Sequence, residues 1–522
     1  MATVRADVPY SIASPVQRVR GTTDVLPVQQ RRLRALAEAL HERFESFGYE
    51  GVDTPILEPL ELFLRKSGDE IVARMYAFAH WNRRLCLRPE HTASVMRLFV
   101  NEFQGRSLPL RLQYTGPEFR YERPSRGRQR QYTVLGLELI GASGPVADAE
   151  VLHLALSGLW AVGLQRYRLV VGHLGVVLQM LRQLGISEHA QGLILDQMEP
   201  LARGRLTVDE ATTRILGLLG AGADEAAVPS DGAPAFEGLA GLPPDQATAL
   251  AADLMRRVSL PLEGSARTPH QIIQRLLAKA TRADPTERVR RAVAFVARLH
   301  EASGEPDRLG ALRALVEQNG LSTAPLDEVE AALRFLRAHG SVPNRDDGAT
   351  WEVDLALARG LRYYTGIVFE VYVDDEGGPL QVCGGGRYDD LIRALGGREA
   401  VPASGFAYGL ERLALATERG GPTPAASPKV LVVPVAHDDL AVALHVAATL
   451  RAAGGMRVEQ DVRLRGVKNA LRHADRSGIA ATVLIGAEER AKGQAIVRGM
   501  ASREERRVPV EDVVAAVQAL AG

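Results

Sequence analysis

Residues Phe119–Tyr132 read FRYERPSRGRQRQY and contain five arginines, at positions 120, 123, 126, 128 and 130, with one carboxylate, Glu122. Apolar and polar residues alternate, as in β-strands, from Leu110 up to this run and again after it to Gly141. The pattern predicts two antiparallel strands joined by an arginine-rich loop. A solvated hairpin tip is the ordinary explanation of such a charge run. Flanking strands would instead hold these cations over a sheet, where guanidinium groups bind phosphate oxygens in bidentate pairs.

The rest of the chain supplies no general excess of positive charge. Its 522 residues include 63 basic and 63 acidic residues, which argues against a surface that coats nucleic acid. This length predicts two to four domains. The two cysteines, Cys86 and Cys383, argue against a disulfide framework and a multi-cysteine metal site. Without a signal-peptide pattern or an apolar run of membrane-spanning length, we expect a cytoplasmic protein that contacts no membrane.

Helical and extended patterns divide the chain outside the arginine run. Amphipathic helices are predicted from Pro27 to Gly48 and from Val146 to Leu164, and residues 50–60 suit a sheet edge or an interface because two prolines interrupt them. Helical patterns flank a Gly-, Ala- and Pro-rich seam at residues 220–245. Strands are predicted at Trp351–Leu357 and Ile367–Val373.

After the linker ERGGPTPAASP, strand-like and helical stretches alternate from KVLVVPVA to TVLIG. This alternation predicts a small α/β domain with a largely parallel sheet. We therefore expect five segments: 1–165 as the first part of a core, 166–340 as a mostly helical insertion, 341–420 as the second part of the core, 421–428 as a linker, and 429–522 as the α/β domain.

Several short motifs follow one another in a specific order. They are RGTTDVLP, the segment around Pro55, LRPEHTASV, FRYERPSRGRQRQY, ARGLRYYTG, CGGGRYDDL and GFAYGLERL. The ordered set resembles the histidyl-tRNA synthetase family of class II aminoacyl-tRNA synthetases, and RGVKNALRHADRSGIAATVLIGAEE resembles the family's anticodon-binding domain. The resemblance implies an α+β fold with an antiparallel sheet and flanking helices, and a homodimer formed through the Pro55 segment. It also implies formation of histidyl-adenylate from histidine and ATP, followed by transfer to tRNA(His).

The resemblance assigns roles in binding ATP. It implies that Arg120 holds the α-phosphate, Glu122 accepts from the adenine amino group, Tyr132 stacks on adenine, and Arg128 and Arg412 hold the outer phosphates. Arg359 would stand near the attacked phosphate, so Arg120 and Arg359 are the expected catalytic residues; a strand-end ion pair is the alternative for Arg359. Mg²⁺ is expected with ATP, held either by protein carboxylates or mainly by the nucleotide.

The resemblance also assigns residues to histidine and to tRNA. The expected histidine-binding residues are Glu90, Thr92, Glu138, Arg359, Tyr363, Tyr364 and Gly385. Glu90 and Thr92 would receive the α-ammonium group, and Glu138 and Tyr364 would bracket the imidazole. As alternatives, Tyr364 is a half-buried strand aromatic, Glu138 an exposed strand residue, and the glycine run a bulge or turn. Contacts to tRNA are expected from Arg463, Arg465, Lys468 and Arg472, for which a solvated helix face is the alternative.

Three positions depart from the family pattern. Val134 replaces a usual glutamine, Arg362 a usual aspartate and His91 a common glycine, all around the expected amino-acid pocket. Arg362 would add positive charge beside the anion site, and His91 would either supply a replacement contact or fill space against Val134. The competing hypothesis is a non-catalytic relative such as the histidine-binding regulatory subunit of ATP phosphoribosyltransferase, which the VGHLG stretch at residues 171–175 resembles. The C-terminal domain argues against it.

Overall fold

The structure is a computed structural model that describes residues 15–65, 69–224, 286–341, 348–357, 359, 361–375, 377–417 and 427–521. The predicted seam lies outside these residues from position 225 onward, as does most of the predicted linker. The chain separates into two compact units, Met1–Pro422 and Thr423–Gly522.

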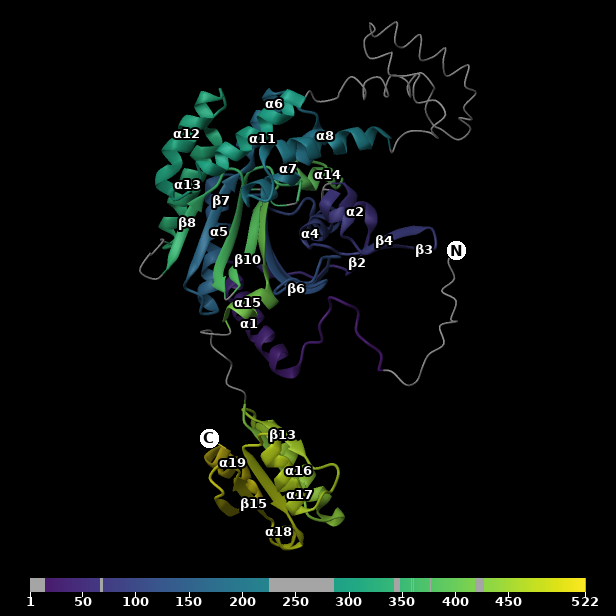
Figure 1. The fold of residues 1–522 in the computed structure, drawn as a ribbon. Helices are drawn as coiled ribbons and strands as arrows, with labels where there is room; N and C mark the ends of the chain where they lie inside the picture. The colour runs from purple at the N-terminus through teal and green to yellow at the C-terminus, as the bar shows by residue number, and fades with distance from the viewer. Residues whose placement is uncertain are drawn as a thin grey trace. The chain divides into compact units, whose positions relative to one another are not determined.

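An eight-stranded sheet forms the centre of the larger unit, in the order β1–β5–β6–β11–β10–β9–β7–β8 (Figure 1). The strands are β1 (Glu50–Gly51), β5 (Leu110–Phe119), β6 (Gln131–Ile140), β7 (Tyr167–His173), β8 (Ala349–Val353), β9 (Ile367–Asp375), β10 (Gly378–Arg387) and β11 (Ala403–Gly409). Neighbouring strands are antiparallel except at the two edges, where β1 pairs with β5 and β8 with β7 in parallel. The predicted antiparallel sheet with flanking helices is confirmed.

The arginine-rich loop joins β5 to β6, as the alternation predicts. These two strands pair from Leu110 opposite Ile140 to Phe119 opposite Gln131. The loop tip closes on itself through reciprocal backbone hydrogen bonds between Ser125 and Arg128, with Gly127 at a φ of 69°. The strands therefore deliver the arginines to one end of the sheet.

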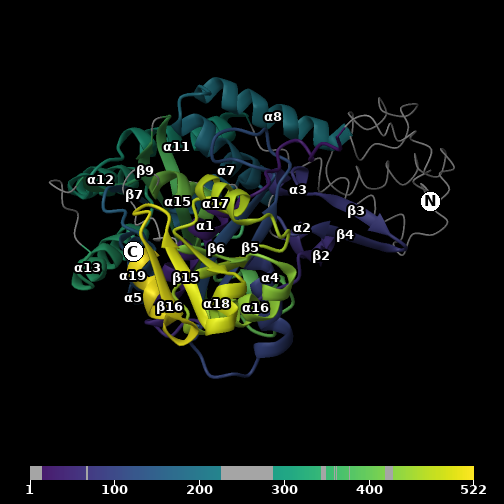
Figure 2. The ribbon, with the colours of Figure 1, turned by 90° about the horizontal axis from the view of Figure 1, so that it is seen from below.

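The proline-interrupted segment 50–60 lies at an edge, as predicted. It contributes β1 to the edge of the large sheet and β2 (Leu57–Pro59) to a three-stranded sheet with β4 (Arg83–Leu87) and β3 (Ala77–His80). Figures 1 and 2 both show the β3–β4 hairpin extending away from the large sheet. Short helices α2 (Leu60–Leu64), α3 (Asp69–Ala73) and α4 (Thr92–Leu98) accompany this sheet, and α4 continues into a π-helical turn at Phe99–Phe103.

Long helices pack against the sheet where amphipathic patterns predict them. Helix α1 (Pro27–Glu45) contacts both α5 (Pro145–Ala161) and α15 (Leu410–Thr417), and all three contact the central strands. Helix α1 buries Leu36, Leu40 and Phe44 on one face. Helix α14 (Leu391–Ala394) is a single turn against α4.

The helical segment between β7 and β8 lies at one end of the sheet (Figure 1). Its described helices are α6 (Leu174–Gln183), α7 (Glu188–Ala202), α8 (Val208–Asp224), α11 (Thr286–Glu301), α12 (Leu309–Gln318) and α13 (Ala324–Ala338). Helix α11 packs on α7 and α8, and α13 packs on α5.

Two predicted boundaries differ from the structure. Residues 167–173, which the sequence pattern places in the insertion, form β7 inside the sheet, because a short apolar run does not distinguish a buried strand from a helix. The strand predicted to run to Leu357 ends at Val353, where Asp354 turns the chain by accepting hydrogen bonds from Ser303 Oγ and the Ala356 backbone N–H.

The smaller unit has a five-stranded sheet in the order β13–β12–β14–β15–β16. Its elements are β12 (Lys429–Pro434), α16 (Leu440–Ala453), β13 (Arg457–Gln460), α17 (Val467–Arg476), β14 (Ala481–Ile485), α18 (Ala487–Lys492), β15 (Gln494–Gly499), β16 (Glu505–Pro509) and α19 (Val513–Ala521). Alternate residues of β12 point to opposite faces of this sheet. One face packs against α16 and α19, and the other face packs against α17. The α/β prediction is confirmed, but the sheet is not largely parallel, because β14–β15 and β15–β16 are antiparallel. Across the described residues, no helix is long and apolar enough to cross a membrane.

Candidate active site

One cavity of about 820 Å³ in the larger unit gathers side chains from segments far apart in the sequence. The arginine loop, the start of α4, helix α7, strands β10 and β11, and the start of α15 all contribute to its wall. Arg120, Arg359 and Arg412 line it together. The three arginines that the resemblance assigns to ATP therefore lie around one cavity.

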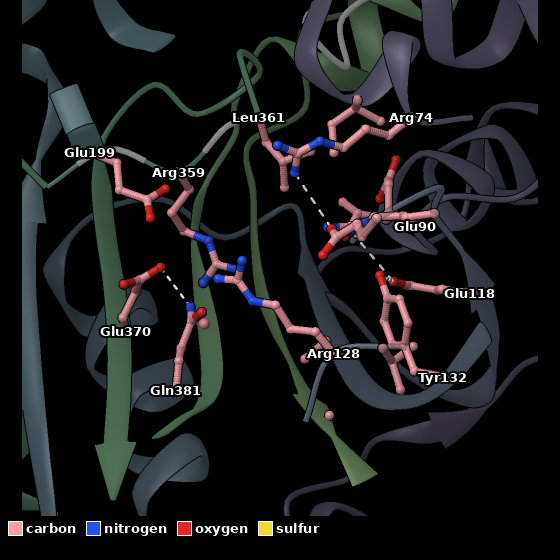
Figure 3. Close-up of a pocket in the computed structure, with 18 of the residues that line it drawn as sticks. Arg74, Glu90, Glu118, Arg128, Tyr132, Glu199, Arg359, Leu361, Glu370 and Gln381 are labelled. Carbon is pink, nitrogen blue, oxygen red and sulfur yellow. Dashed lines mark hydrogen bonds and ion pairs between the residues drawn. The ribbon is translucent and has the colours of Figure 1, made fainter. Parts of the chain in front are cut away.

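Guanidinium groups enter the middle of the cavity from opposite walls. Figure 3 shows Arg359 and Arg128 pointing toward one another between the Glu370 side and the Tyr132 side. Arg412 is fixed by donating from Nε to the Gly127 carbonyl at 2.8 Å and from Nη1 to the Gln381 carbonyl at 2.9 Å. Burial, and next the charge of Arg128, lower the pKa of Arg412. Cations held this close to one another favour a polyanionic ligand between them.

The glycine run of β10 makes the approach of Arg359 sterically feasible. A Cβ on Gly384 would lie 1.3 Å from Arg359 Nη1, so only glycine leaves room for the guanidinium group across this strand. A Cβ on Gly385 would instead lie 2.2 Å from the Gly405 carbonyl oxygen of the neighbouring strand. Gly384 lines the cavity and Gly385 does not, so the sequence-predicted Gly385 lies behind the cavity surface.

Carboxylates occupy the other end of the cavity. Both oxygens of Glu90 accept from the Ala93 backbone N–H, at 3.1 and 3.2 Å, so Glu90 caps the start of α4. Burial, together with the charge of nearby Glu118, raises the pKa of Glu90 to about 8. A buried acid in this state ionises readily when a cation arrives beside it.

Glu138 is fully buried and is half satisfied by hydrogen bonds. Its Oε1 accepts from Thr92 Oγ1 at 2.9 Å and from Tyr114 Oη at 3.2 Å, whereas no donor among the described residues reaches Oε2. Burial raises its pKa well above the usual range. Glu138 lies behind the lining residues Thr92 and Gly405, and a Cβ on Gly405 would be 2.2 Å from Oε2.

The two tyrosines predicted to bind histidine also lie at the cavity. Tyr363 and Tyr364 line the cavity with ring centroids 4.9 Å apart, and both pack against Tyr388. Burial raises the pKa of both phenols, so both stay protonated and can donate. The Tyr388 hydroxyl has no partner among the described residues.

The residues predicted to bind the nucleotide line the same cavity. Arg120 donates from Nε to the Pro89 carbonyl at 2.8 Å, and its guanidinium carbon lies 5.8 Å from the centroid of the Tyr132 ring. Glu122 lines the cavity and pairs with Arg74 at 3.6 Å. The site therefore has an aromatic face, a carboxylate and several cations within one cavity.

The three departures from the family pattern take distinct places. Val134 lines the cavity, and the buried His91 ring stacks on Tyr114 at 4.6 Å between centroids with 6° between planes. Arg362 does not itself line the cavity. Its Nη2 donates at 2.6 Å to Asp196 of α7, which does line the cavity, and Gly192 leaves room for its guanidinium group.

Some lining residues were not predicted from the sequence. Glu118 binds His91, Tyr132 and Arg120, and Gln381 donates to Glu370 at 2.6 Å near Arg359. A signal for Glu118 does exist: it precedes Arg120 by two residues and therefore shares its face of the strand. Among the described residues, no group of three or more His, Cys, Asp or Glu side chains is placed to hold a metal ion.

The predicted tRNA-binding residues lie in the smaller unit, around the start of α17. Buried Asp461 organises the loop before this helix by accepting from the backbone N–H groups of Arg463, at 3.3 Å, and Arg465, at 2.9 Å. The Arg465 guanidinium group also forms an ion pair with Asp461 at 3.1 Å, so its charge helps to stabilise this loop. Arg463, Lys468 and Arg472 remain exposed.

Comparison with known proteins agrees with this geometry. The family model described as histidyl-tRNA synthetase matches residues 21–220 and 250–413, and an anticodon binding domain matches residues 429–520. Histidine–tRNA ligase of Methanocaldococcus jannaschii is 30% identical over 500 residues, which cover 95% of this chain and 98% of that protein. The ligase of Pyrococcus furiosus is 31% identical and covers 96% of this chain and 98% of its own. Apo histidyl-tRNA synthetase of S. aureus has the same fold, with a TM-score of 0.60, 24% identity, and coverage of 97% of this chain and 100% of its own. The chain belongs to the histidyl-tRNA synthetase family of class II aminoacyl-tRNA synthetases.

Proposed function

We propose that the protein activates histidine with ATP and then transfers the histidyl group to tRNA(His). In the first step the histidine carboxylate attacks the α-phosphorus, which forms histidyl-adenylate and releases pyrophosphate. In the second step a terminal ribose hydroxyl of tRNA attacks the activated carbonyl and AMP leaves. Because its second substrate is tRNA, the protein acts in the cytoplasm.

The observation that supports the proposal is that cations and a buried acid line one cavity. Arg120, Arg128, Arg359 and Arg412 line it together with Glu90, Tyr363 and Tyr364. The arginines suit a triphosphate, and Glu90 suits an ammonium group. The reacting carboxylate and α-phosphate would then meet between them, where charge develops in the transition state.

The arginines are assigned to the nucleotide. Arg120 and Arg359 would stabilise negative charge on the α-phosphate, and Arg128 and Arg412 would hold the outer phosphates. Tyr132 would stack on adenine, and Glu122 would accept from its amino group. Mg²⁺ would neutralise part of the charge on the triphosphate oxygens.

The carboxylates and tyrosines are assigned to histidine. Glu90 and Thr92 would receive the α-ammonium group. The unpartnered Oε2 of Glu138 and the Tyr364 hydroxyl would bind the two imidazole nitrogens after a small adjustment around Gly405. A site built from such buried polar groups rejects amino acids that lack matching nitrogens, because its own groups would stay unpaired.

The proposal includes a homodimer. Large apolar side chains are exposed on and beside the β2–β4–β3 sheet: Ile56, Leu57, Leu64, Phe78 and Trp81. Exposed apolar residues gathered in this way are typical of protein interfaces. Light scattering during size-exclusion chromatography should report twice the chain mass of 56.5 kDa.

A regulatory role without catalysis is less well supported. The anticodon binding match at residues 429–520 and the exposed cations of α17 have no use in a subunit that only senses histidine. The division of the chain into the predicted segments remains a prediction, except that residues 167–173 form β7 of the sheet and do not belong to the insertion.

Histidine-dependent exchange between ATP and pyrophosphate tests the proposed first step. We expect exchange with histidine and none with phenylalanine or glutamine, and charging of tRNA(His) in a second assay. Histidine binding without exchange would instead point to a regulator.

A further inference from the structure

Glu118 lies at the centre of a network that joins the two ends of the cavity. On one side its Oε1 accepts from the His91 backbone N–H and from His91 Nδ1, each at 3.0 Å. On the other side its Oε2 accepts from Tyr132 Oη at 3.0 Å and lies 3.5 Å from Arg120 Nη2. Figure 3 shows Glu118 beside Tyr132, below Glu90.

The charge state of Glu118 differs from that of the other buried carboxyls. Burial alone would raise its pKa, but the hydrogen bond from His91 and the Arg120 charge outweigh burial and lower it. Glu90 and Glu138 shift in the opposite direction. Glu118 is therefore the ionised carboxylate of the group, and its charge is already satisfied by protein donors. This suits a residue that holds other side chains in place.

His91 carries the network onward to the amino-acid end. Its backbone lies between Glu90 and Thr92, and its ring stacks on Tyr114, which donates to Glu138. Residues 114, 116 and 118 of β5 share one face of the strand, and His91 packs against this face. A Cβ on Gly116 would overlap the Arg88 guanidinium group and would lie 2.9 Å from His91 Nε2, so glycine there leaves space for both side chains.

We propose that Glu118 is a positioning residue that couples the nucleotide end of the cavity to its amino-acid end. One carboxylate oxygen orients Tyr132 and Arg120, and the other fixes His91 and with it the loop that carries Glu90 and Thr92. The inference rests on the proposed function, because it takes ATP and histidine as the two ligands. Binding of either ligand then stabilises the geometry that the other one needs.

The main test replaces Glu118 with an isosteric amide. Glu118→Gln removes the charge that pairs with Arg120, and its NH₂ group then faces either Arg120 or the His91 backbone N–H, both of which can only donate. In histidine-dependent pyrophosphate exchange we expect KM for ATP and KM for histidine each to rise about tenfold or more. By calorimetry, the factor by which a non-hydrolysable ATP analogue tightens histidine binding should fall toward one.

A second variant divides the network. His91→Ala leaves the contacts of Tyr132 and Arg120 with Glu118, so KM for histidine should rise severalfold more than KM for ATP. In the double variant that combines His91→Ala with Glu118→Gln, the rise in KM for histidine should be far smaller than the product of the rises in the two single variants. Glu118→Asp, which keeps the charge, should recover part of the ATP affinity.

The matched control is Glu58→Gln. Glu58 is equally buried and pairs with Arg97 at 2.8 Å, but it does not line the cavity. It should lower thermal stability without changing the two KM values or the coupling factor. If Glu118→Gln behaves like Glu58→Gln, or lowers kcat alone, Glu118 does not position the substrates and the inference is wrong.

Failure of the proposed function has a different outcome. A wild-type protein without exchange contradicts that function, and the network is then judged by calorimetry with ATP and histidine separately. Weakened binding of both in Glu118→Gln still supports the coupling role. Unchanged binding in the variant, or no binding to the wild type, overturns it.

Discussion

At the scale of single residues, we expect the protonation of Glu90 to link histidine binding to pH, if Glu90 receives the α-ammonium group as proposed. Its pKa of about 8 in the free protein follows from burial and then from the charge of Glu118. A bound α-ammonium group favours the ionised carboxylate and lowers this pKa, so binding near pH 7 releases a proton. As pH rises, a smaller fraction of Glu90 is protonated and has to ionise on binding. The Kd for histidine should therefore fall between pH 7 and 8 and level off above 8.

Calorimetry in buffers with different ionisation enthalpies measures that proton release. The window above pH 7 avoids the titration of the imidazole of free histidine, which has a pKa near 6.5. Glu90→Gln should weaken binding and remove most of the released proton, while Glu58→Gln should change neither. An undiminished proton release in Glu90→Gln would assign the titration to another group, with Glu138 the first candidate.

A second prediction at the residue scale concerns Gly384. Alanine there would place a methyl group 1.3 Å from the present position of Arg359 Nη1, so the guanidinium group must leave the cavity. Loss of one preorganised charge at the reacting phosphate costs about a hundredfold in kcat. We expect that decrease in pyrophosphate exchange by Gly384→Ala, with the fold retained.

Gly377→Ala is the matched control for Gly384→Ala. It lies just before the same strand, and a Cβ there meets no atom within 4 Å. Its exchange rate should equal that of the wild type. A near-normal rate for Gly384→Ala itself would remove Arg359 from the group that acts on the phosphate.

At the scale of elements, an ion pair connects helix α7 to the loop that carries the two tyrosines. Arg362 and Asp196 are 2.6 Å apart, and their side chains are 21% and 14% exposed. Reversing either charge should destabilise the protein by about 1–2 kcal/mol and raise KM for histidine, because the loop loses its anchor. Urea denaturation and exchange kinetics measure the two effects.

The charge swap Arg362→Asp with Asp196→Arg should restore part of both losses. Arg313→Ala, which breaks exposed pairs between α12 and α13, provides the control and should cost less than about 1 kcal/mol with KM unchanged. If the swap is no better than the single variants, the pair does not hold the loop.

The elements also show what the sequence could and could not predict. Strands β5 and β6 are recognisable because their alternation and the arginine run between them are local signals. The pairing of Arg362 with Asp196 joins residues 166 positions apart, and no local pattern indicates it. The antiparallel end of the smaller sheet was predictable in principle. Only eight residues separate β14 from β15, too few for a parallel crossover.

At the scale of the whole molecule, the two units have separate hydrophobic cores. The larger core surrounds the eight-stranded sheet, and the smaller unit buries its own residues on both faces of its five-stranded sheet. All the residues that line the cavity belong to the first unit, and the exposed cations of α17 belong to the second. Adenylate formation and tRNA binding are therefore expected to respond to different substitutions.

The exposed cations in α17 and in the loop before it give the sharpest test of that separation. If Arg463, Lys468 and Arg472 each contact a tRNA phosphate, replacing all three with alanine should reduce the slope of log K against log salt by about 2–3. KM for tRNA in the charging assay should rise, while histidine-dependent pyrophosphate exchange stays unchanged. Arg506 is a cation of the same unit that is paired with Glu504. Arg506→Ala should change neither the salt slope nor KM for tRNA. An unchanged salt slope in the triple variant would show that these side chains form a solvated helix face, and the tRNA contacts would then have to come from other residues.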